Sequence, residues 1–225
     1  MKINEDALDN PVWNALTDTH FNQSIDYGNV KFYQSDFAPF GAFINDEDTS
    51  HAIEKHSKLI KDFFIVGKEP KMPSGFKPAI KYVGYQMIIY NKINHLISED
   101  IVKLNEKHYN QLIDLIKLVY PEYFKAKTNT LGTYYGIFKN NKLVAVTGER
   151  FQTKNFVEIS AVITHPDYTG KGYAKQLITH TANGIFNKNK IPFLHVDVTN
   201  LGPIALYKKL GFTIRREIEF WKIGH

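Results

Sequence analysis

Two glycines one position apart, Gly170 and Gly172, directly precede a run of residues with helical periodicity. Glycine lets a backbone approach a phosphate closely, and the first amides of a helix have no intrahelical partners. The spacing excludes a P-loop, which needs G-x-x-x-x-G-K-S/T, and a dinucleotide fingerprint needs a third glycine where Lys175 stands. The pattern therefore predicts either an anion site of another kind or a glycine-rich helix start without a ligand.

A second block of residues follows this loop in a fixed order. A strand ending THP leads into the loop TGKGYA (169–174) and a helix, and a further strand ends at Asn200. Tyr207 then stands seven positions after Asn200 and is followed by KKLGF (208–212). In this order the residues from about 96 to 225 resemble the GNAT superfamily of acyl-CoA-dependent N-acyltransferases.

The resemblance implies acetyl-CoA as co-substrate. The superfamily's phosphate loop, Q/R-x-x-G-x-G/A, has threonine at its first position here, which removes one cationic or amide contact to the pyrophosphate. It also implies a bulge in the preceding strand, whose amides near Val162 and Thr164 pair with the pantetheine arm, and the amide of Val162 as oxyanion donor. The implied cofactor-binding residues are Val162, Ile163, Thr164, Thr169, Gly170, Lys171, Gly172, Tyr173, Ala174 and Asn200.

Two side chains are candidates for proton transfer when a free amine attacks the thioester. Tyr207 is the candidate acid for the leaving thiolate, because a phenol is neutral at pH 7, and its alternative is packing between Ile204 and Leu210. Glu158 is the candidate base, because it lies in an apolar strand where burial would raise its pKa. Its alternative is a rim glutamate that faces water.

Other polar residues have simpler interpretations. Asn200 has two compatible interpretations: it caps the following helix, which is the default, and it bonds the pantetheine arm. We expect His165 to be a turn residue, His108 to pack on a helix face, and His195 to be a satisfied core histidine rather than a catalytic one. No histidine and carboxylate spacing predicts a metal site.

Composition limits the classes of protein that this chain can represent. It has 225 residues, of which 43% are apolar and 23% charged, and this balance excludes disorder of the whole chain. The absence of cysteine excludes a disulfide framework and a cysteine nucleophile. The net charge is +5, but the lysines are scattered, so we expect a solvated surface rather than a nucleic-acid site; a small polyanionic cofactor would also benefit from the positive charge.

The second half of the chain has a regular pattern of elements. A helix is predicted over 98–124, ended or kinked by Pro121, and a hairpin over 133–152 with its turn at 140–141. A strand at 155–166, a helix at 170–187, a strand at 193–200 and a short helix at 203–210 follow, and 212–223 closes the order as one or two strands.

The first half carries no chemical motif. Short apolar pieces predict strands at 30–34, 40–45, 63–67 and 85–90, with a helix at 49–63, in a β-β-α-β-β order. We divide the chain into residues 1–94 and residues 95–225. By the resemblance, the second part is the catalytic GNAT domain, and our hypothesis is that the first is a degenerate GNAT-like or an accessory half that closes over the acceptor site. The expected fold is α/β (α+β), with a mixed, mostly antiparallel sheet flanked by helices.

The opening DNPVWNALT (9–17) and the stretch 158–178 are similar to a narrower bacterial subgroup. That subgroup has an extra N-terminal half and a C-terminal domain similar to glycine N-acyltransferase-like proteins. The resemblance implies an N-acetyltransferase with a small-molecule or peptide amine as acceptor; a non-catalytic acyl-CoA-binding sensor or pseudoenzyme is the alternative. With no apolar run of about 20 residues and no signal sequence at MKINEDALDNPVW, we expect a cytoplasmic protein without membrane contact.

Overall fold

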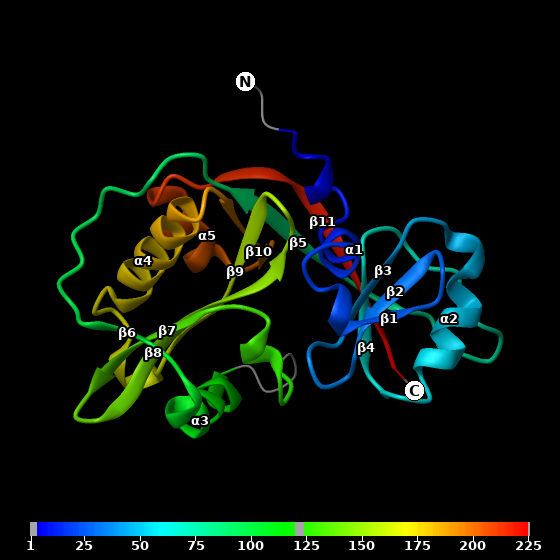
Figure 1. Ribbon diagram of the computed structural model, residues 1–225, viewed down its shortest axis with the longest axis horizontal. Coiled ribbons are helices and arrows are strands. Elements are labelled where there is room, and N and C mark those ends of the chain that lie inside the picture. Colours follow the sequence, from blue (N-terminus) through cyan, green and yellow to red (C-terminus); the bar gives the residue numbers. More distant parts are fainter. Residues whose placement is uncertain (1–3, 120–123, 225) are drawn as a thin grey trace.

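The computed structural model describes residues 4–119 and 124–224. These residues form one sheet with the strand order β1-β2-β3-β4-β11-β5-β10-β9-β8-β7-β6 (Figure 1). The strands are β1 (Ser24–Asp26), β2 (Val30–Tyr33), β3 (Phe40–Phe43), β4 (Phe63–Val66), β5 (Ile80–Ile88), β6 (Ile101–Lys103), β7 (Tyr134–Lys139), β8 (Lys142–Gln152), β9 (Phe156–Thr164), β10 (Ile191–Asp197) and β11 (Thr213–Ile223). The mixed, mostly antiparallel sheet confirms the expected fold class.

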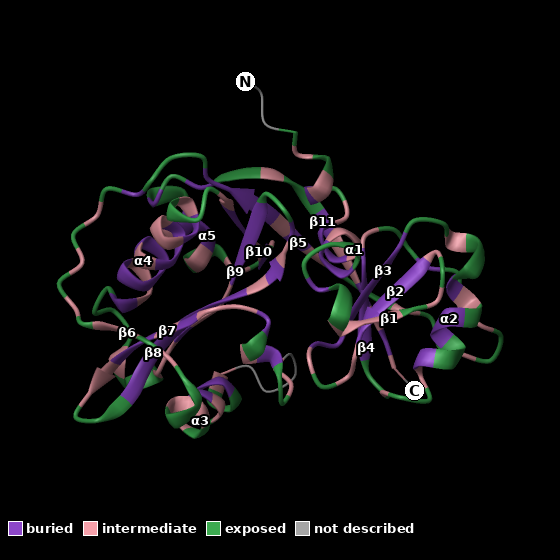
Figure 2. Cartoon of the chain, in the orientation of Figure 1, coloured by how far each residue is buried: buried purple, intermediate pink, exposed green. Residues whose placement is uncertain are grey.

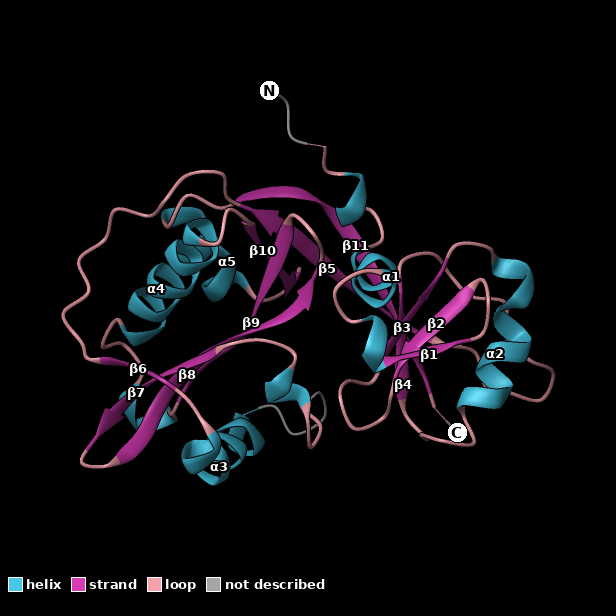
Figure 3. Cartoon of the chain, viewed as in Figure 1, coloured by secondary structure: helices cyan, strands magenta, loops and turns pink. Residues whose placement is uncertain are grey.

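Helices flank the sheet (Figure 3). They are α1 (Pro11–Thr17), α2 (Thr49–His56), α3 (Tyr109–Val119), α4 (Tyr173–Asn187) and α5 (Leu201–Lys209). Helices α3 and α4 cover opposite faces of the sheet. Successive residues of a strand point to opposite faces, and in β8 Leu143 packs in the cluster of α3 whereas Val144 packs with Leu177 of α4. Among the described residues, no helix is long and apolar enough to cross a membrane.

Strand β5 joins the two halves of the chain. It precedes β10 and β11 by more than a hundred residues yet lies between them, antiparallel to both. Figure 1 shows β5 and β11 running from the α4 side of the molecule to the side that holds β1–β4. The domain boundary at residue 94 stays a prediction, and the sheet itself is continuous across it.

The apolar core follows the sheet on both sides of β5 (Figure 2). One cluster packs α1 against the N-terminal strands and Phe151, Phe156 and Phe193 from β8, β9 and β10. A second packs α4 and α5 against β9 and β10. Because the first cluster draws residues from both halves, the N-terminal strands are held against the C-terminal ones by shared burial rather than by a linker.

The expected elements of the second half are largely confirmed, and the segment 98–124 is the exception. Residues 101–103 form β6, which pairs with β7, and α3 begins only at Tyr109. The reason is local: the side chain of Asn105 accepts a hydrogen bond from the amide of Lys107, while His108 Nδ1 accepts one from the amide of Asn105. This capping starts the helix there. Pro121 lies outside the described residues.

In the first half, the four expected strands and the helix are present, and α2 ends at His56, earlier than expected. The helix α1, the three-residue strand β1 and three short 3-10 helices were missed. The start of α1 has a clear signal in the sequence: Asn10 accepts a hydrogen bond from the amide of Trp13, and Pro11 occupies the first helical position.

Candidate functional site

The glycine loop before α4 presents free backbone donors. Gly170 and Gly172 have φ of 75° and 76°, a left-handed conformation that favours glycine. No amide from Gly170 to Lys175 donates a hydrogen bond to the described part of the chain, and α4 has no side-chain cap. A Cβ added at either glycine would meet no atom within 4 Å, so the loop is open. Six consecutive donors at the positive end of a helix suit an anion such as a pyrophosphate.

The side chains of this loop contribute less than its backbone. The hydroxyl of Thr169 donates to the carbonyl of Pro166 at 3.0 Å, and the Lys171 ammonium lies over the ring of Tyr168, 4.7 Å from its centroid. The ring of Tyr173 is buried in the core against Leu177, and Ala174 is half-buried. The anion-binding capacity therefore resides in the main chain of this loop.

Strand β9 carries the expected bulge. Its register against β8 shifts between the pairs Val146–Ile163 and Gly148–Ser160, and Ala161 takes a φ of 51°. A positive φ is strained for alanine, and such strain persists only where surrounding structure holds it. The bulge turns this part of β9 away from regular pairing.

Strands β9 and β10 diverge beyond this point. They pair in parallel at Phe156–Glu158 and Ile191–Phe193, and no further pair forms between them in the described residues. The segment from Ile159 to Thr164, which includes Val162 and Ile163, therefore pairs with β8 but not with β10. Unpaired strand groups of this kind accept an extended ligand as an additional strand.

A pocket of about 430 Å³ opens where the strands diverge. It is lined from β9 by Ser160 and Val162, and from α5 by Tyr207. The N-terminal half supplies Phe40 and Phe64. The pocket thus joins the diverging strands to the N-terminal strands, and its walls are mainly apolar and aromatic.

The structure brings Tyr207 and Asn200 to this pocket. Tyr207 is buried with its ring edge-on to Phe212, 6.0 Å between centroids. Asn200 stands at the N-cap of α5, but its side chain makes no capping hydrogen bond. The capping interpretation of Asn200 is therefore wrong, and its side chain lines the pocket instead.

Glu158 is buried in an ion pair at the pocket wall. Its Oε2 accepts from Arg150 Nε at 2.7 Å and from the Phe151 amide at 3.3 Å. Its Oε1 accepts from Arg150 Nη2 at 2.8 Å and from His195 Nδ1 at 2.7 Å. Burial of the carboxylate, which raises the pKa, is outweighed by the charge and hydrogen bonds of Arg150 and by the hydrogen bond from His195, and the pKa of Glu158 falls to about 2. The expectation of a raised pKa is wrong, because Arg150 pairs with Glu158. The sequence alone does not show this pairing.

His195 lies at the centre of a longer polar chain. In its neutral form Nδ1–H donates to Glu158, and Nε2 accepts from Gln86 Nε2 at 3.2 Å. Gln86, on β5, also accepts a hydrogen bond from Arg215 Nη1 at 3.0 Å. The side chain of His195 is satisfied, as expected, but it lines the pocket. Its place beside Glu158 was missed because it depends on the pairing of β9 with β10.

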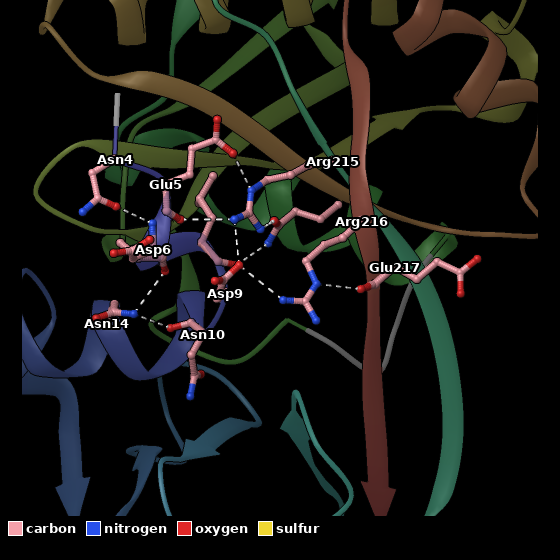
Figure 4. Close-up of polar contacts among 12 residues, drawn as sticks. Asn4, Glu5, Asp6, Asp9, Asn10, Asn14, Arg215, Arg216 and Glu217 are labelled. Atoms are coloured by element: carbon pink, nitrogen blue, oxygen red, sulfur yellow. Dashed lines mark hydrogen bonds and ion pairs between the residues drawn. The ribbon is translucent and has the colours of Figure 1, made fainter. Parts of the chain in front are cut away.

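The outer end of this chain ties the N-terminal segment to β11 (Figure 4). Arg215 Nε donates to Glu5 at 2.6 Å, and its Nη2 donates to Asp9 at 2.7 Å. Arg216 reaches the same carboxylate oxygen of Asp9 at 3.3 Å. These contacts fix the segment before α1 to β11.

The remaining candidates agree with their simpler interpretations. His165 caps a turn, accepting from the amide of Asp167 at 3.3 Å, and His108 contacts Phe138. Thr164, at the end of β9, is half-buried. In residues 4–119 and 124–224, no cluster of histidine and acidic residues could hold a metal ion.

Comparisons with known proteins give independent information on the fold. The family model described as FR47-like protein matches residues 134–221. The crystal structure of a putative acetyltransferase of the GNAT family from Novosphingobium aromaticivorans is 27% identical with a TM-score of 0.86, covering 96% of this chain and 97% of that one. No curated protein matches the sequence.

Two more distant structures share the fold. A GCN5-related N-acetyltransferase-like protein from Streptococcus suis is 14% identical with a TM-score of 0.65, covering 97% of this chain and 96% of that one. A GCN5-related N-acetyltransferase from Kribbella flavida is 10% identical with a TM-score of 0.65, covering 100% and 97%. Together with the glycine loop and the diverging strands, these likenesses identify the chain as a GNAT-fold protein, similar over almost its whole length to a putative acetyltransferase of the GNAT family.

Proposed function

We propose that the protein is an N-acyltransferase that moves an acetyl group from acetyl-CoA to a primary amine. The observation that carries this proposal is the row of free amides from Gly170 to Lys175 beside a β9 edge that β10 leaves unpaired. The first suits the pyrophosphate and the second the pantetheine arm, so one co-substrate accounts for both. Its thioester supplies an activated acyl group with a thiolate as leaving group.

The residues at the pocket have distinct roles in this proposal. The amide of Val162 stabilises the oxyanion. Asn200 binds the pantetheine arm through its side chain, which does not cap α5. The amine nitrogen forms a bond to the carbonyl carbon as the carbon–sulfur bond breaks. Tyr207 donates its phenolic proton to the leaving sulfur and regains one from solvent.

Glu158 is our candidate for the group that receives the ammonium proton. Its low pKa and its four donors make the carboxylate a weak proton acceptor, so this role requires a donor such as His195 to give way. Glu158→Gln tests the role: a loss of kcat at unchanged acetyl-CoA affinity and unchanged unfolding temperature supports it. Equal loss of stability and activity would assign Glu158 to structure alone, as the partner of buried Arg150.

The experiment that tests the function is calorimetric titration with acetyl-CoA, followed by thiol release on addition of primary amines. Micromolar binding and amine-dependent thiol release support the proposal. Binding without transfer to any amine would favour the non-catalytic acyl-CoA sensor. No binding would overturn both and leave the loop as a helix start.

We propose further that the chain belongs to the bacterial subgroup with an extra GNAT-like N-terminal half, and that it acts in the cytoplasm. Support for an accessory role of residues 1–94 comes from Phe40 and Phe64, which line the same pocket as Tyr207.

A further inference from the structure

Arg150 is the cationic group of the pocket to which the proposed reaction assigns no part. It lies on β8 with 14% of its side chain exposed, and it lines the pocket. Its guanidinium lies over the rings of Phe40 and Phe151, with 4.7 Å and 4.3 Å between the central carbon and the ring centroids. Two aromatic contacts and the ion pair with Glu158 hold the group in one orientation.

The fork of Arg150 is only partly used. Nε and Nη2 bond Glu158, whereas Nη1 makes no hydrogen bond to any described residue. A guanidinium has five N–H donors in a fixed plane, so Nη1 and the outer N–H of Nη2 form a second edge. This edge can bind a further carboxylate with charge-assisted hydrogen bonds.

The surroundings indicate what kind of acceptor this edge suits. The carboxylate of Glu158 already accepts four hydrogen bonds. The ring of Phe64 lies next to that of Phe40, with 5.6 Å between the ring centroids. A plain alkylamine would leave the free edge of Arg150 without an acceptor inside a largely apolar pocket. A pocket of about 430 Å³ has the size of a small-molecule site.

We propose that the acyl acceptor is a free amino acid whose carboxylate binds the second edge of Arg150. Its amino group then points toward Tyr207, and its side chain packs against Phe40 and Phe64. This inference rests on the proposed acyl transfer for its chemistry, but the binding of the amino acid does not depend on it.

The test compares free amino acids with their amides, which keep the amine and lose the carboxylate. Binding of each is measured by calorimetry with CoA present, and transfer by thiol release. We expect the wild type to bind at least one amino acid ~10- to 100-fold more tightly than its amide. Arg150→Lys keeps a charge for Glu158 without the second edge, and should abolish that preference while keeping acetyl-CoA affinity.

Arg216→Lys is the matched control, because Arg216 lies on β11 outside the pocket lining and should leave the preference intact. Unfolding temperatures of both variants show whether Arg150→Lys folds. If it does not fold, the ratio of the wild-type affinities for the amino acid and for its amide still tests the inference. Equal binding of acids and amides, or no binding of any amino acid, would overturn the inference. Acetyl-CoA binding with transfer to amines that lack a carboxylate at least as efficient as transfer to free amino acids would overturn it and leave the proposed function intact.

Discussion

The strands on the two sides of β5 and β11 differ in how many backbone hydrogen-bonding groups they leave without a partner. On the N-terminal side, β2, β3 and β4 are four residues long and buried throughout. On the C-terminal side, β9 carries a bulge, separates from β10 and precedes a loop with free amides. Unsatisfied backbone groups are costly unless water or a ligand meets them. In our proposal the co-substrate therefore binds in the second half, and the first half contributes side chains to the pocket.

Buried titratable groups differ between the two sides as well. Before β4, desolvation lowers the pKa of both His20 and His56 to about 4, so both are neutral in the folded protein at pH 7. On β8 and β9, Arg150 and Glu158 are buried as charged partners. A neutral histidine needs no counter-charge, whereas a buried carboxylate does. Charge at the pocket wall is therefore maintained by the second half.

The largest effect is expected from blocking the glycine loop. Gly172→Trp places a bulky side chain in the open loop at positive φ, and acetyl-CoA affinity should fall by roughly 100-fold or more, about 2.7 kcal/mol. Gly28→Trp is the matched control, because Gly28 has φ of 81° and equally open surroundings in the β1–β2 turn. Calorimetry on both proteins checks the prediction. Equal loss in the two would attribute the effect to strain and not to the loop.

Loss of the phenolic hydroxyl should act on the chemical step. Tyr207→Phe keeps the ring packed against Phe212, so kcat should fall by roughly 100-fold. The dissociation constant of acetyl-CoA should hold. Steady-state kinetics with titration calorimetry measure both quantities. An unchanged kcat would return Tyr207 to its packing interpretation.

Acid should weaken the two sides at different pH. The pKa of His20 and of His56 is below the ordinary 6.5 in the folded state, so the unfolded chain binds more protons, and stability is lost as pH falls from 6.5 through about 4. The pKa of Glu158 is also lowered in the folded state, so its contribution to stability is lost as pH falls from 4.5 through about 2. Each group contributes at most about 3 kcal/mol.

Amide hydrogen exchange, corrected for intrinsic rates, checks this order. Between pH 6.5 and 5, protection of β2–β4 should fall while that of β8 and β9 holds. His51→Gln is a control, because His51 is exposed on α2 and should not alter the profile. A uniform fall across the sheet would show that the two sides unfold as one unit.

The smallest effect is expected at the aromatic wall. Phe64→Leu removes part of the pocket lining and should raise the KM for the amine about tenfold, with acetyl-CoA affinity unchanged. Phe63→Leu is the matched control, because Phe63 is buried in the cluster with Phe32 and Trp221 and does not line the pocket. Similar changes in both variants would mean that the KM reports stability rather than acceptor binding.

The sequence by itself determined the features that depend on neighbouring residues. The glycine pair predicted a loop that needs positive φ, period-2 and helical patterns placed most strands and α4, and the resemblance placed the bulge. These features are local because a dihedral angle or a buried face is set within a few positions.

Only the tertiary structure decided the features that join distant residues. It placed β5 between β10 and β11, and it brought Arg150 and His195 to Glu158, which reversed the expected direction of its pKa shift. It also brought Phe40, Phe64 and Tyr207 to one pocket. Each of these depends on strand order and register, and a one-residue change of register moves every side chain of a strand to the other face. Periodicity along the chain does not specify that pairing.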